Sequence, residues 1–119
     1  KNKNILIVDD NSTVLKLLSA MLKKFEIKCI EAGSGEAALD IIKSGKKIDL
    51  ILLDIQMPDM DGIAALNLIR EIYPSMKVIA QTANAFEEDK EKYTSIGFNG
   101  YVSKPFNRTE IIKTISSLI

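Results

Sequence analysis

The sequence predicts an α/β fold in which five parallel strands form one sheet and helices cover both of its faces. Two observations indicate this fold. Short apolar runs alternate with amphipathic stretches, in five successive pairs along the chain. The runs at 5–8 and 50–53 are also apolar at every position, which is typical of central strands buried on both faces. The chain has 119 residues, so residues 1–119 are expected to form a single domain with one core.

The first strand, Ile5–Val8, leads into a helix that begins near Asn11 or Ser12, either of which can cap it, and ends near Lys24. Apolar residues at helical spacing are expected to face the core: Val14, Leu17, Leu18 and Met21. Leu15 falls outside that stripe, so the spacing predicts that it is exposed. A wider core stripe that includes Leu15 is the alternative.

The second strand, Ile27–Glu31, is followed by a helix from a cap at Ser34 to Gly45, which suits the left-handed position after a helix. This helix is expected to face the core with Ala37, Ala38, Ile41 and Ile42. The remaining strands are expected at Leu50–Leu53, Lys77–Gln81 and Gly100–Ser103. The remaining helices are expected at about Ile63–Ile72, which stops before Pro74, then Ala85–Ile96, and finally Asn107–Leu118.

The composition excludes several classes of protein. Apolar residues make up 46% and charged residues 27%, the balance of a folded globular chain. The 16 basic residues offset the 16 acidic ones, so direct binding to nucleic acid or to an anionic membrane is not expected. Cys29 is the single cysteine, and no signal peptide or membrane-spanning run appears, so a cytoplasmic location is expected. Because the chain starts at Lys1 rather than Met, we expect it to come from a longer or processed protein.

Acidic residues follow two of the expected strands at their carboxyl ends. Asp9 and Asp10 come directly after the first strand, and Asp54 comes directly after the third. In an open parallel sheet, ligands collect at this edge where the strand order reverses, here between the first and third strands. Three converging carboxylates repel one another unless a cation lies among them, and Mg²⁺ prefers such oxygen ligands. Asp10 taken alone could equally be a helix cap.

Two further polar residues are expected at the same edge. Thr82 closes the fourth strand and Lys104 follows the fifth. A carboxylate oxygen can attack phosphorus when metal and ammonium groups neutralise the charge of the transferring group, and Lys104 would supply the ammonium. The Thr82 hydroxyl could donate to a phosphoryl oxygen once that group is present. Taken singly, Thr82 could be an ordinary strand-end hydroxyl and Lys104 a solvated charge.

Together these residues resemble the receiver (REC, CheY-like) domains of two-component response regulators, over essentially the whole chain. The resemblance depends on four motifs in order: Asp9-Asp10, Asp54 within Leu53-Asp54-Ile55-Gln56-Met57-Pro58-Asp59-Met60-Asp61-Gly62, Thr82-Ala83, and Lys104-Pro105-Phe106. It implies an α/β, doubly wound (βα)5 flavodoxin-like sandwich with strand order 2-1-3-4-5.

The resemblance also implies roles for the site residues. Asp54 would be the phosphoacceptor, and Asp9, Asp10, Asp54 and the backbone carbonyl of Gln56 would surround Mg²⁺, with Asp9 acting through water. Tyr101, in the fifth strand, would turn inward when Thr82 moves toward the phosphoryl group, and so change the surface of the fourth helix, fifth strand and fifth helix. A half-buried strand tyrosine without that role is the alternative. Such a chain phosphorylates and dephosphorylates itself rather than turning over a substrate.

The resemblance implies a histidine kinase or histidine phosphotransfer protein as the phosphodonor. The chain contains no histidine, so the donor histidine lies outside this sequence. Leu15, expected to be exposed near the acidic residues, is predicted to contact the donor. The segment Ile79–Phe86 resembles receivers fused to hybrid sensor histidine kinases, although a free-standing receiver or one from a transcription factor is also compatible.

Two other functional classes share part of this pattern. A Mg²⁺-dependent phosphatase or phosphotransferase with an aspartyl nucleophile usually has a second acid two residues after that nucleophile, where this chain has Gln56, and a cap-sized insertion, for which no segment exists. In a flavodoxin-like cofactor carrier, the first turn binds a phosphate. Asp9 and Asp10 in that turn would repel it unless a metal intervened.

Overall fold

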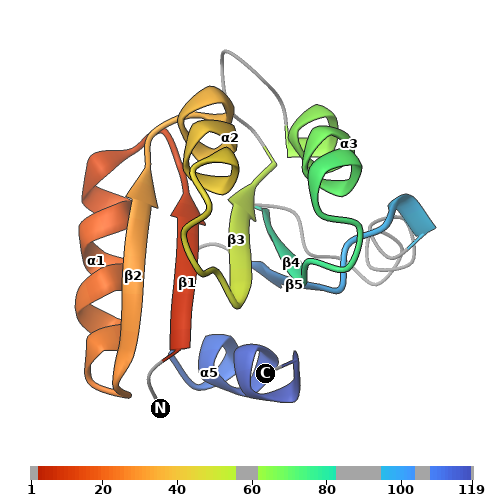
Figure 1. Ribbon diagram of the computed structural model, residues 1–119. Coiled ribbons are helices and arrows are strands. Elements are labelled where there is room, and N and C mark those ends of the chain that lie inside the picture. Colours follow the sequence, from red (N-terminus) through yellow and green to blue (C-terminus); the bar gives the residue numbers. More distant parts are fainter. Residues whose placement is uncertain (1–2, 56–61, 83–94, 104–107, 119) are drawn as a thin grey trace.

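The computed structural model describes residues 3–55, 62–82, 95–103 and 108–118 (Figure 1). Its strands are β1 (Lys3–Val8), β2 (Ile27–Ala32), β3 (Leu50–Asp54), β4 (Val78–Thr82) and β5 (Gly100–Ser103). They form one parallel sheet of order β2-β1-β3-β4-β5. The predicted fold class and strand order are therefore confirmed, with strand ends that shift by at most two residues.

The described helices are α1 (Ser12–Lys23), α2 (Gly35–Lys43), α3 (Gly62–Ile72) and α5 (Arg108–Leu118). They agree with the predicted ranges. The predicted helix at Ala85–Ile96 lies outside the described residues except for its helical last two residues, 95 and 96. Among the described helices, none is both long and apolar enough to span a membrane.

The sheet has a hydrophobic core on each face, because successive side chains of a strand point to opposite sides. Figure 1 shows α2 and α3 together over one face, and the buried apolar side chains of that layer form the α2/α3 core. Helices α1 and α5 supply the other layer, the α1/α5 core. Successive residues of each strand belong alternately to the α2/α3 core and the α1/α5 core. The strand residues of the α1/α5 core are Ile5, Ile7, Leu50, Leu52, Ile79 and Val102, and those of the α2/α3 core include Leu6, Val8, Ile51, Leu53, Val78 and Ala80.

Local capping fixes where the first two helices begin and end. The Asn11 side chain accepts hydrogen bonds from the backbone N–H groups of Thr13 and Val14, at 2.9 and 3.4 Å. Ser34 accepts one from Ala37 at 3.1 Å. Gly45 follows α2 with φ of +85°, a conformation that costs a residue with a side chain more than it costs glycine. These caps confirm the predicted helix boundaries.

The predicted core stripe of α1 is confirmed for Leu18 and wrong for Leu17. The structure buries Leu15, Leu18 and Leu22, while Val14 and Met21 are half-buried at the edges of the stripe. Leu17 is 55% exposed, whereas Leu15 is only 6% exposed and packs in the α1/α5 core. With Asn11 as the cap, the positions facing the sheet are spaced at i, i+3 and i+7 from Leu15. The expected exposure of Leu15 was therefore incorrect, and the alternative, a wider core stripe that includes Leu15, is confirmed.

Candidate phosphoacceptor and metal site

The carboxyl ends of β1 and β3 lie side by side at one edge of the sheet, where both arrowheads point in Figure 1. Val8 pairs with Leu53, so Asp9 and Asp54 are the next residues along neighbouring strands. The residues just before them, Val8 and Leu53, are apolar and fully buried, and they anchor the backbone up to the point where the acidic residues begin. Alternation then directs the side chains of Asp9 and Asp54 to the same face, that of α1 and α5.

Asp9, Asp10 and Asp54 converge as the sequence predicts. One carboxylate oxygen from each residue can be chosen so that all three lie within 4.8 Å of one another. Asp9 is 0% exposed and Asp54 is 3% exposed, whereas Asp10 lies at the exposed side of the cluster. The Asp9 carboxylate also accepts a hydrogen bond from the backbone N–H of Asn11 at 2.9 Å, which holds the turn between β1 and α1. Solvent thus reaches the cluster at Asp10.

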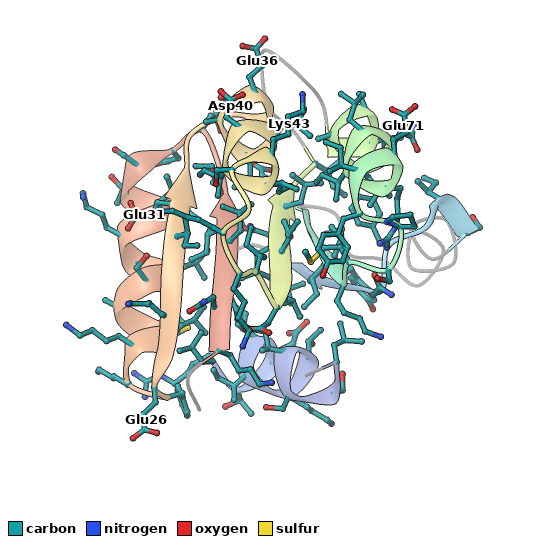
Figure 2. All side chains as sticks on the ribbon, viewed as in Figure 1. Glu26, Glu31, Glu36, Asp40, Lys43 and Glu71 are labelled. Atoms are coloured by element: carbon teal, nitrogen blue, oxygen red, sulfur yellow. The ribbon has the colours of Figure 1, made fainter. Side chains whose placement is uncertain are left out.

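This group of oxygens fits a hard divalent cation. Three carboxylates this close, two of them buried, repel one another, and a cation among them removes that repulsion. Mg²⁺ takes oxygen ligands and retains several waters, so a partial shell of this kind suits it. Acidic residues elsewhere are arranged differently: Glu36, Asp40 and Glu71 are exposed and point away from the sheet (Figure 2).

The other predicted site residues lie at the same edge or outside the described residues. Thr82 is the last residue of β4, and it pairs with Ser103, the last residue of β5. Lys104 directly follows Ser103 in the chain but lies outside the described residues, as does Gln56. The backbone positions of β4 and β5 are therefore compatible with the predicted constellation.

Tyr101 is half-buried in β5, where it pairs with Ala80 of β4 and packs against the α2/α3 core. Its neighbour Val102 faces the opposite core. Both readings of Tyr101 made from the sequence, a switch residue and an ordinary strand tyrosine, are compatible with this position.

The sequence analysis did not single out two polar residues, Arg70 and Gln81. Arg70 makes several hydrogen bonds, and the buried side chain of Gln81 makes none. Arg70 donates hydrogen bonds to the carbonyls of Met76 and Gly97, the latter at 2.8 Å, and to Asn99 Oδ1 at 2.8 Å. It thereby joins the end of α3 to the segment that precedes β5, and burial lowers the pKa of its guanidinium. Gln81, by contrast, is fully buried without a hydrogen-bond partner for its side chain. The sequence signal that could have identified Gln81 is its place as a polar residue directly after the apolar run Val78–Ala80.

Known proteins with similar sequences identify the family of this chain. Residues 5–116 match the family model of the response regulator receiver domain. Hybrid signal transduction histidine kinase L of Dictyostelium discoideum is 42% identical over 118 residues, which cover 93% of this chain and 7% of that protein. Probable histidine kinase 4 of Oryza sativa subsp. japonica is 33% identical over 98% of this chain and 14% of its own length. The chain thus spans a small part of these relatives.

The solved structures that match cover the whole fold. The receiver domain of sensor histidine kinase PA1611 from Pseudomonas aeruginosa PAO1 superposes with a TM-score of 0.86 at 30% identity, over 99% of this chain and 98% of that one. That structure has a magnesium ion coordinated in its active-site cleft.

Proposed function

Since this chain belongs to the family of response regulator receiver domains, which act in two-component signalling, we propose that it accepts a phosphoryl group on Asp54. The observation that supports this most directly is the convergence of Asp9, Asp10 and Asp54 within 4.8 Å at the carboxyl edge of the sheet. All 119 residues would serve as one receiver domain.

Asp54 suits the acceptor role better than the other two acids. It ends the central strand β3, between β1 and β4, with only 3% of its surface exposed. Asp9 and Asp10 lie together in the turn that leads from β1 into α1, and Asp10 is exposed. In the transfer, an Asp54 oxygen forms a bond to phosphorus while the bond between phosphorus and the donor histidine nitrogen breaks, and its electron pair stays on that nitrogen.

Asp9, Asp10 and Asp54 would hold Mg²⁺, with the backbone carbonyl of Gln56 as a further ligand. Bound Mg²⁺ supplies positive charge that offsets the negative charge of the transferring phosphoryl group. Asp10 is the exposed member of the cluster, so water and the incoming phosphoryl group would approach from its side.

Lys104 would supply an ammonium group to the phosphoryl oxygens, and Thr82 a hydroxyl that senses them. Support comes from the register of β4 and β5. Thr82 pairs with Ser103, so the residue after Ser103 follows a strand end at the same edge as Asp54. A hydroxyl and an ammonium from two further strands would complete the site.

The output surface would comprise the predicted fourth helix, Ala85–Ile96, most of which lies outside the described residues, together with β5 and α5, with Tyr101 as a switch residue. An open groove of about 370 Å³ lies between β5 and α5 and is lined by residues that include Tyr101, Glu110 and Thr114. A change in the packing of Tyr101 would alter one wall of this groove, which a partner could detect.

The phosphodonor would be a histidine kinase or a histidine phosphotransfer protein, which the receiver family and the histidine-kinase relatives support; this sequence has no histidine of its own. We expect no direct contact of this domain with nucleic acid, since its basic and acidic residues number 16 each. A cytoplasmic location fits the reduced Cys29 thiol. Donor contact through Leu15 is not retained, because Leu15 is buried.

Acetyl phosphate labelling tests the function. The protein is incubated with acetyl phosphate and Mg²⁺, and its intact mass is measured for wild type, Asp54→Asn and Asp40→Asn. Asp40 is an exposed acid on α2, so its variant controls for the change in charge. We expect wild type and Asp40→Asn to gain one phosphoryl group and Asp54→Asn to gain none. Labelling of Asp54→Asn at the wild-type level would refute the assignment.

A further inference from the structure

Gln81 is the one buried side chain in the described part of the protein whose polar atoms all lack a hydrogen-bond partner. Its side chain is 0% exposed, and neither Nε2 nor Oε1 is paired. Buried amide groups are almost always paired, because an unmade hydrogen bond there destabilises the folded state. The unpaired amide therefore requires a partner that the protein does not supply here, either a buried water or a group that is present only in another state of the protein.

The position of Gln81 identifies a group of the second kind. It pairs with Asp54 of β3 on one side and with Val102 of β5 on the other. Alternation along β4 places its side chain on the same face as Ile79, in line with the side chain of Asp54. Neighbouring strands lie about 4.8 Å apart, a separation that a glutamine side chain can span. On its other side, Val102 is apolar and offers no hydrogen bond.

We propose that the Gln81 amide donates a hydrogen bond to an oxygen of the phosphorylated Asp54 side chain, and so acts as a positioning residue that favours the phosphorylated state. This inference rests on the proposed function of Asp54. Phosphorylation adds three strong acceptor oxygens beside an Nε2 group whose two donors are unused. A contact that forms in only one state shifts the equilibrium toward that state.

The alternative occupant is a buried water that pairs with Gln81 in both states. Such a water would satisfy the amide without favouring either state, because it contributes no differential interaction. The two cases therefore differ in how strongly a phosphoryl analogue binds when the amide is removed.

Binding of beryllofluoride in the presence of Mg²⁺ distinguishes them, because this anion occupies the place of the phosphoryl group on an aspartate. Its affinity is measured by ¹⁹F NMR titration of wild type, Gln81→Met and Ile79→Met. Ile79→Met is the matched control, an apolar change two residues earlier on the same face of β4. We expect Gln81→Met to bind about tenfold more weakly than wild type, the effect of losing one hydrogen bond to a charged group. We expect Ile79→Met to bind like wild type.

Equal affinity of wild type and Gln81→Met overturns the inference and favours the water, while leaving the proposed function intact. Absence of beryllofluoride binding by wild type itself refutes the proposed function. If Gln81→Met does not fold, an NMR measurement on wild type alone still tests the inference. The assigned ¹H–¹⁵N signals of the Gln81 side-chain amide should shift on addition of beryllofluoride, and unchanged signals would contradict the proposed hydrogen bond.

Discussion

Replacing Asp54 with asparagine is expected to stabilise the magnesium-free protein, because it removes one of three converging charges. Asp9 and Asp54 are both buried, and their oxygens lie within 4.8 Å of each other. Two unit charges 4.8 Å apart repel by about 3.5 kcal/mol at an effective dielectric constant of about 20. Asp10 is exposed, so its repulsion is strongly screened and is not counted.

The hydrogen bond that the Asp9 carboxylate accepts from the backbone N–H of Asn11 reduces the net repulsion below this value. We therefore expect Asp54→Asn to raise the free energy of unfolding by about 1–3 kcal/mol in the absence of divalent cations. Mg²⁺ should narrow this difference in stability between the variant and wild type. At ten times its dissociation constant, it stabilises wild type by about 1.4 kcal/mol, and it should stabilise Asp54→Asn much less.

Urea denaturation with EDTA and then with Mg²⁺ measures both effects. Asp40→Asn is the control, because it removes the same charge from an exposed site on α2 (Figure 2). If Asp54→Asn proves no more stable than Asp40→Asn in EDTA, the carboxylates do not repel as their separation implies. If Mg²⁺ stabilises wild type and Asp54→Asn equally, Asp54 is not a ligand.

Three further predictions follow from the described side chains. Leu15→Ala should lower the free energy of unfolding by about 2–5 kcal/mol and Leu17→Ala by less than about 0.5 kcal/mol, since only Leu15 is buried; equal urea midpoints would contradict this burial. Arg70→Met should lower it by about 1–3 kcal/mol, because it leaves backbone carbonyls, including that of Met76, without their donor; an unchanged midpoint would exclude this structural role. Burial raises the pKa of the Cys29 thiol to about 11, so iodoacetamide should modify the folded protein at pH 7 roughly 100-fold more slowly than the urea-unfolded chain, and comparable rates would rule out a buried thiol. Because this folded-state pKa lies above the unfolded value of 9.0, Cys29 should also reduce stability as the pH rises from 9.0 to about 11.

Strands and helix ends could be predicted because their signals are local. Continuous apolar runs mark strands buried on both faces, and Asn11, Ser34 and Gly45 cap helices through contacts with their own neighbours. The rotation of α1 about its axis is not local. Seven of the nine residues from 14 to 22 are apolar, so two stripes one residue apart fit the sequence equally well. Packing against the sheet selects the stripe that contains Leu15.

The acidic part of the site could be predicted for a different reason. Parallel strands end at one edge, so residues directly after the strands converge whatever the details of packing, and Asp9, Asp10 and Asp54 do so. Gln81 could not be assigned in the same way. Near a strand end, a glutamine can face solvent, and only the register of β4 between β3 and β5 shows that it is buried beside Asp54.

That register also constrains how phosphorylation could reach the output surface. Asp54 faces the α1/α5 side of the sheet, whereas Tyr101 packs on the α2/α3 side, so the two side chains do not share a face. Strand β4 lies between them: Gln81 pairs with Asp54, and the preceding residue, Ala80, pairs with Tyr101. Because consecutive residues of a strand face opposite sides, a small shift of β4 changes the packing of both cores at once. We therefore expect the coupling between phosphorylation and Tyr101 to be most sensitive to substitutions in β4.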